Sequence, residues 1–111
     1  MKIETQQVGT VEVFKPIGTL VEDDATTFAQ KLKRRLSSSS ARVVLDLHEV
    51  PYVDSTAIEA LLDAAEQMEQ RTSRLRLVSV APTVREVLEL TGLSKRMQFF
   101  EQVQDAVRSF L

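Results

Sequence analysis

The sequence predicts an α/β domain with a mostly parallel mixed sheet of roughly four to five strands, about four helices and an N-terminal β-hairpin. The first observation behind this prediction is that two short β-type runs, separated by a glycine, open the chain. The second is a nearly unbroken apolar run, ARVVLDL at residues 41–47, which is typical of a strand covered on both faces by helices. The third is the alternation of helical and strand patterns that follows, because such alternation produces parallel strands joined by right-handed crossovers.

The chain begins with the hairpin and an amphipathic helix. Residues 2–7 and 11–17 have strand composition, and Gly9-Thr10 between them suits a tight turn with positive φ. From about Asp24 to Leu36, apolar residues recur on one helical face. Basic residues gather towards its end, at Lys31, Lys33, Arg34 and Arg35. Cations there favour the helix dipole, so we interpret them as a solvated helix end, followed by a serine loop at residues 37–40.

The later elements alternate between helix and strand. A second helix is indicated by apolar residues at helical spacing, Ile58, Leu61, Leu62, Ala65 and Met68. Residues 75–80 alternate as a strand does, and a third helix follows, whose start is predicted from the capping box Thr83-Val-Arg-Glu86 and whose end is predicted from Gly92. A last short strand contains Phe99-Phe100, and a closing helix carries Val103, Ala106, Val107 and Phe110.

Composition restricts the function. A length of 111 residues predicts one domain, residues 1–111. The formal net charge of -2 argues against a nucleic-acid partner, which would require clustered cations. The chain has no cysteine and one histidine, His48, so we expect neither a metal site nor a cofactor. No apolar run is long enough to span or insert into a membrane, and the start does not resemble a signal peptide, so we expect a soluble cytoplasmic protein.

The stretch PYVDSTAI, residues 51–58, contains more polar residues than a helix start requires. Asp54, Ser55 and Thr56 are all good N-caps. If Asp54 is the cap, Val53 and Ile58 form a hydrophobic staple, whereas if Thr56 is the cap, it pairs with Glu59 in a capping box. Neither register uses Ser55. In open α/β sheets, functional groups gather where strands lead into helix N-termini, and Ser55 has such a position.

Catalysis is the contrasting interpretation of Ser55. The serine is not in a Gly-x-Ser-x-Gly elbow, and His48 is the only histidine that could serve as its base. Glycine is too scarce for a phosphate loop, with only Gly9, Gly18 and Gly92 in the chain. We therefore do not expect an enzyme.

Two long segments carry a family resemblance, VVLDLHEVPYVDSTAIEALLDAAEQ and RLRLVSVAPTVREVLELTGLSKRMQFFEQVQDAV. They resemble the STAS domain, named for sulphate transporters and anti-sigma-factor antagonists. The matching features are a hydrophobic strand that ends in Asp46-Leu47, then Asp54-Ser55 at a helix start, and later the Thr91-Gly92-Leu93 helix stop. The resemblance covers nearly the whole chain and implies the STAS fold.

The resemblance also implies a regulatory, protein-binding function in transcription and signal transduction. In antagonists of this family, a partner anti-sigma factor that is also a serine kinase phosphorylates the serine after the aspartate, and a phosphatase reverses the modification. The matching residue here is Ser55, with Asp54 and Thr56 as neighbours. We expect the partner to contact this site and the acidic side of the second helix, at Tyr52, Glu59, Asp63 and Glu66. The resemblance assigns no oligomeric state.

The sequence departs from the antagonist pattern at two positions. Ala57 stands where antagonists usually have glycine, and Val21 follows Gly18-Thr-Leu20 where they commonly have an aspartate near the serine. Glu22, Asp23 and Asp24 are the nearest carboxylates, each at a different offset. The alternative function that the family offers is that of a non-phosphorylated STAS subunit or scaffold in a lipid-transport ABC complex.

Overall fold

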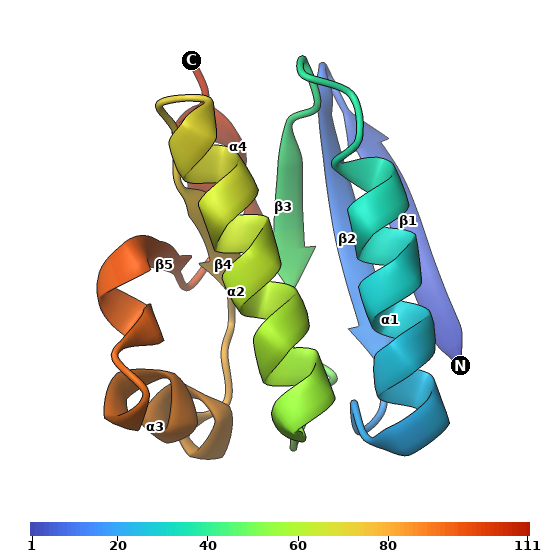
Figure 1. The fold of residues 1–111 in the computed structure, drawn as a ribbon. Helices are drawn as coiled ribbons and strands as arrows, with labels where there is room; N and C mark the ends of the chain where they lie inside the picture. The colour runs from blue at the N-terminus through green and yellow to red at the C-terminus, as the bar shows by residue number, and fades with distance from the viewer.

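Helices cover both faces of one five-stranded sheet in the computed structural model, which describes residues 1–111 (Figure 1). The elements in chain order are β1 (Lys2–Val8), β2 (Val11–Ile17), α1 (Glu22–Arg35), β3 (Val43–Asp46), α2 (Ser55–Gln70), β4 (Leu75–Val78), α3 (Pro82–Leu90), the 3-10 helix η1 (Leu93–Arg96), β5 (Met97–Phe100) and α4 (Val103–Arg108). This order confirms the predicted hairpin and the predicted alternation of helices and strands.

The sheet has the strand order β1-β2-β3-β4-β5. β1 and β2 are antiparallel and are joined at Gly9, whose φ of 61° suits the tight turn. The pairings β2–β3, β3–β4 and β4–β5 are all parallel. The sheet is therefore mostly parallel and mixed, as predicted, and the carboxyl ends of its parallel strands meet at one edge.

The core lies mainly between the sheet and the pair α1 and α2. Strand side chains alternate between faces, so Leu45 points into this main core, whereas Val44 belongs to a smaller cluster that packs against Ala106 of α4. Both residues have no exposed surface. The prediction that the strand at residues 41–47 is covered on both faces is confirmed, although the strand itself is shorter, Val43–Asp46.

Other element boundaries differ from the predictions as well. α1 begins at Glu22, two residues earlier than Asp24. β4 ends at Val78 rather than at residue 80, because Ser79 has a φ of 55°, a left-handed conformation that a strand does not accommodate. The hydroxyl of Ser79 donates to the carbonyl oxygen of Glu101 at 3.0 Å, which ties this bend to the loop that follows β5.

The predicted capping box at the start of α3 is wrong, whereas its predicted end is confirmed. The helix begins at Pro82, a residue whose fixed φ and missing N–H suit the first helical position, and its N-cap, Ala81, has no side-chain cap. Thr83 therefore lies inside the helix. At the other end, Gly92 has a φ of 79° and the following Leu93 is buried, as expected for a glycine stop.

Candidate functional site

Ser55 is the first residue of α2, directly after the N-cap. Its side chain is exposed, and its hydroxyl takes part in no hydrogen bond within the protein. The other aliphatic hydroxyl of the stretch, that of Thr56, belongs to a half-buried residue. Ser55 therefore carries the aliphatic hydroxyl of this stretch that is both accessible and free of hydrogen bonds within the fold.

Asp54 is the N-cap of α2, so the capping register with Thr56 and Glu59 is wrong. The Oδ1 atom of Asp54 accepts from the backbone N–H of Ala57 at 3.0 Å, which places Val53 and Ile58 at the staple positions, with Val53 buried. The Oδ2 atom accepts from the backbone N–H of Glu22 at 2.7 Å. These bonds, first from Glu22 and then from Ala57, lower the pKa of the Asp54 carboxyl group below its ordinary value.

The loop before α1 and the loop before α2 lie side by side. Leu20 and Val53 form a parallel β-bridge, in which the N–H of Leu20 donates to the carbonyl of Tyr52 and the N–H of Asp54 donates to the carbonyl of Leu20, both at 2.9 Å. This bridge continues the parallel pairing of β2 with β3 beyond the carboxyl ends of the two strands. It brings the start of α1 next to Asp54-Ser55, as Figure 1 shows for the two helices.

Val21 occupies the position where the resemblance expects an aspartate. It is the N-cap of α1, with extended backbone and no side-chain cap. The side chains of Glu22, Asp23 and Asp24 are exposed in the first turn, and the Oδ1 atom of Asp24 lies 3.6 Å from the N-terminal amine. The only side-chain hydrogen bond between the start of α1 and the Ser55 loop therefore involves the backbone of Glu22 and not one of these carboxylates.

The start of α3 also belongs to this end of the molecule. The hydroxyl of Thr83 donates to the carbonyl oxygen of Pro51 at 3.0 Å, one residue before Tyr52, whose side chain is 57% exposed. Sequence reasoning missed both this contact and the one from Glu22. Each joins residues 32 positions apart, a distance at which no local pattern indicates contact.

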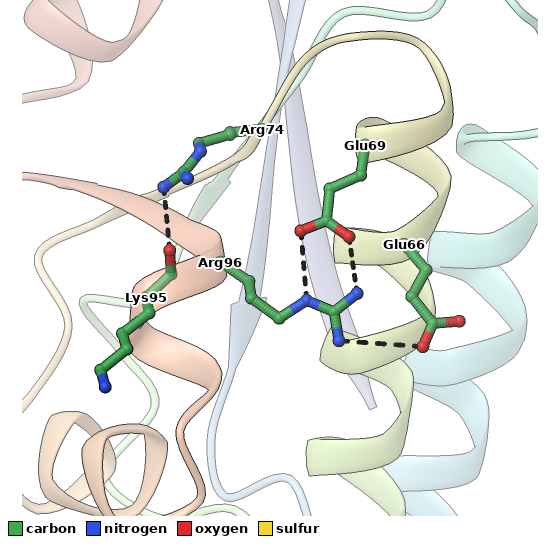
Figure 2. Close-up of polar contacts among 5 residues, drawn as sticks. All are labelled: Glu66, Glu69, Arg74, Lys95 and Arg96. Atoms are coloured by element: carbon green, nitrogen blue, oxygen red, sulfur yellow. Dashed lines mark hydrogen bonds and ion pairs between the residues drawn. The ribbon is translucent and has the colours of Figure 1, made fainter.

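The acidic side of α2 is partly neutralised. Glu59 and Asp63 are exposed and form no ion pair, whereas Arg96 of η1 reaches Glu66 and Glu69 (Figure 2). The Nη2 and Nε atoms of Arg96 donate to the two carboxylate oxygens of Glu69 at 2.6 and 3.1 Å, and its Nη1 atom lies 3.9 Å from Glu66. The hydrogen bond with Arg96 lowers the pKa of Glu69. Glu59 and Asp63, on the turns after Ser55, are therefore the free charges of the predicted acidic face.

His48 is exposed, and its Nε2 atom lies 3.8 Å from the carboxylate of Glu49. No hydrogen bond or ion pair joins it to Ser55. No cluster of three or more acidic or histidine side chains has the spacing to hold a metal ion. The local chemistry of the site is thus an exposed hydroxyl at a helix N-terminus, beside a carboxylate held by backbone N–H groups.

The model of the STAS domain family matches residues 2–106. BtrV of Bordetella bronchiseptica, described as a candidate anti-sigma factor antagonist, is 28% identical over 92 residues, which are 83% of this chain and 79% of that protein. No helix of the chain combines the length and the apolar character needed to cross a bilayer.

Two solved structures show the same fold. An anti-sigma factor antagonist from Mycobacterium paratuberculosis has a TM-score of 0.81 at 22% identity, over 97% of this chain and 92% of that one. The Bacillus cell fate determinant SpoIIAA in its phosphorylated form has a TM-score of 0.75 at 17% identity, over 99% of this chain and 100% of that one.

Proposed function

This chain belongs to the STAS domain family, and we propose that it is a regulatory protein-binding module of the anti-sigma-factor-antagonist type. In this proposal, a partner that is both an anti-sigma factor and a serine kinase phosphorylates Ser55, and a phosphatase restores the unmodified protein. The names of BtrV and of the antagonist from Mycobacterium paratuberculosis support the type. The structural observation that carries the proposal is the exposed Ser55 hydroxyl, which no part of the fold uses.

The fold is suited to accept a phosphate at Ser55. A phosphate adds roughly -1.5 to -2 charges and three acceptor oxygens, and a helix N-terminus favours an anion through its free N–H groups and its dipole. Asp54 already accepts from the N–H of Ala57, which leaves the N–H groups of Ser55 and Thr56 at the first turn. We therefore expect modification to leave the domain folded.

A partner surface over Ser55 would respond differently. It would have to desolvate the new charge beside the ionised Asp54 and close to Glu59, where no cation of this chain forms an ion pair. We propose that Tyr52, Glu59, Asp63 and Glu66 complete the partner's footprint, with Glu66 contributing through its ion pair with Arg96. The expected weakening is about 5- to 150-fold, the usual scale of regulatory coupling.

A pull-down from the native cell tests the proposal. Wild type, Ser55→Ala and Ser55→Asp serve as baits, with Ser38→Asp as the matched control, because Ser38 is also exposed but lies in the loop at the other end of α1. We expect wild type, Ser55→Ala and Ser38→Asp to retain a kinase-fold partner that Ser55→Asp loses, and mass spectrometry to locate phosphate on Ser55. Equal capture by all four baits, or recovery of a transport ATPase instead, would favour the scaffold alternative.

A further inference from the structure

A concave surface of about 580 Å³ lies between α1 and the β1–β2 hairpin. Its lining includes four basic side chains and one acidic side chain, although the chain as a whole has a net charge of -2. The basic residues are Lys31, Arg34, Arg35 and Arg42. Three of them, Lys31, Arg34 and Arg35, come from the last turns of α1. Arg42 follows the serine loop and also lines the concavity, but its guanidinium carbon lies 5.9 Å from the ring centroid of Phe110.

The ion pairs of this cationic concavity leave most of its charge uncompensated. Arg35 pairs with Glu12 at 3.2 Å, and Arg42 donates to the hydroxyl of Thr10 at 3.1 Å. Lys31 and Arg34 form no ion pair, because the acidic residues of α1 are confined to its first turn. Lys33 lies in the groove between α1 and α2. The sequence-based interpretation of a solvated helix end therefore fits Lys33 better than it fits Lys31, Arg34 and Arg35.

The remaining lining indicates what kind of anion would fit. Thr5, Gln7 and Ser40 supply further polar groups, and the volume is within the range of about 300–1,000 Å³ that is usual for small-molecule sites. The only aromatic lining residue, Phe14, is 1% exposed, so no ring is available for a base to stack on. Arginine and lysine around a polar cleft suit phosphate oxygens.

We propose that this cationic concavity binds a small soluble ligand that carries two or more phosphate groups. Arg34 and Lys31 are the charges free to meet the phosphates, and Arg42 and Arg35 are held against the hairpin by Thr10 and Glu12. The site lies at the end of α1 where the serine loop begins, opposite the end where α2 starts with Ser55 (Figure 1). It goes beyond the proposed phosphorylation switch and does not depend on it.

Calorimetric titration with sodium tripolyphosphate tests this proposal on the purified chain. We expect saturable binding of one ligand per chain, weakened about 10-fold by Arg34→Gln or Lys31→Gln, the factor that corresponds to one charge-assisted hydrogen bond. Lys33→Gln is the matched control, since it removes the same charge from the same helix but from the other groove. Glu12→Gln should tighten binding, because it frees Arg35 and removes the one carboxylate.

A second arm separates a soluble ligand from a lipid headgroup. The same variants are tested for sedimentation with phosphatidylcholine vesicles that contain phosphatidic acid. Binding to tripolyphosphate that depends on Arg34 and not on Lys33 supports the proposal. Absence of saturable binding, equal loss in Lys33→Gln, or binding to the vesicles alone would each overturn it, the second by showing diffuse charge attraction and the third by indicating a membrane surface.

Discussion

Asp54 joins the starts of two helices: its Oδ2 atom accepts from the backbone N–H of Glu22 at 2.7 Å, while its Oδ1 atom caps α2 at Ala57. Glu22 has a φ of 52°, a left-handed conformation that costs a non-glycine residue roughly 1–2 kcal/mol. The Asp54 carboxylate therefore stabilises the strained turn at Glu22 through one hydrogen bond and caps α2 through another. Asp54, beside the proposed phosphorylation site, therefore links two helix starts through hydrogen bonds and also contributes a negative charge to the site.

Replacing Asp54 with asparagine should change how stability depends on pH. The pKa of Asp54 is lowered in the folded state, chiefly by the Glu22 N–H, so its stabilising contribution is complete above the unfolded pKa of about 3.9 and is lost as the pH falls through the folded pKa. We expect the wild type to have a melting temperature several degrees above that of Asp54→Asn at neutral pH, and the two to converge in acid.

Thermal unfolding followed by circular dichroism between about pH 2.5 and pH 7 measures this difference. Asp23→Asn is the control, because the exposed carboxylate of Asp23 forms no hydrogen bond and no ion pair. A constant difference between wild type and Asp54→Asn across the whole range would contradict the explanation, since it would show that the charge of Asp54 is irrelevant.

Thr83→Val tests the contact between α3 and the loop before α2. The valine has nearly the same shape but cannot donate to the carbonyl of Pro51, so we expect a loss of about 0.5–1.5 kcal/mol in the free energy of unfolding. Thr83→Ser keeps the hydroxyl and should lose less. Urea denaturation distinguishes them, and equal losses would show that the methyl group, rather than the hydrogen bond, is what matters.

Gly92→Ala tests the stop of α3. No atom lies within 4 Å of the position that a Cβ would occupy, so the φ of 79° is the only source of strain. We expect a destabilisation of about 1 kcal/mol for alanine and less for asparagine, which tolerates this conformation better. Urea denaturation of both variants provides the measurement, and an alanine variant as stable as the wild type would mean that the turn can relax to negative φ.

Phe110→Ala tests the attachment of the chain end to the sheet. The guanidinium carbon of Arg76 lies 3.7 Å from the ring centroid of Phe110, and Arg76, which is 8% exposed, has no carboxylate partner. Its donors reach only neutral oxygens, among them those of Ser109, with the Nε to Oγ bond at 2.6 Å. Loss of the ring should cost about 2 kcal/mol, the scale of a desolvated cation–π contact.

The comparison variant for this contact is Phe110→Leu, which keeps apolar cover over Arg76 without the ring. We expect its free energy of unfolding, from urea denaturation, to lie between those of the wild type and Phe110→Ala. Hydrogen exchange should show faster exchange in α4 for the alanine variant. Identical stability of the leucine variant and the wild type would assign the contact to hydrophobic cover alone.

The sheet and its covering could be predicted because their signals are local. The continuous apolar run around β3 and the helical spacing in α2 each follow from which faces are buried, whereas the residues of β4 are all buried, Arg76 included, although its sequence alternates. The predicted ends of helices are less accurate where a polar side chain can either cap the helix or hydrogen-bond to another segment. Thr83 suited a helix cap by composition, yet Pro82 starts α3 earlier and leaves that hydroxyl for Pro51.

At the site, too, local signals predict the residues but not the contacts between distant segments. The surplus of polar residues at one helix start identifies Asp54 and Ser55 as candidate site residues, and it leaves both capping registers open. The β-bridge between Leu20 and Val53 determines which residues surround Asp54, because it places the start of α1 next to the N-cap of α2. That bridge lies outside the named strands, and the residues around it show no periodic pattern from which it could be predicted.

By itself, the sequence determined the order of elements, the two-sided burial of β3 and the placement of Ser55 at a helix N-terminus, since each depends on residues within a few turns of one another. Only the tertiary structure decided that Asp54 accepts from the N–H of Glu22, that Arg96 pairs with Glu66 and Glu69, and that Lys31 and Arg34 line a concavity beside the β1–β2 hairpin. Such contacts join distant segments. They arise from the way the helices pack on the sheet, which brings together charges and backbone groups that are well separated along the chain.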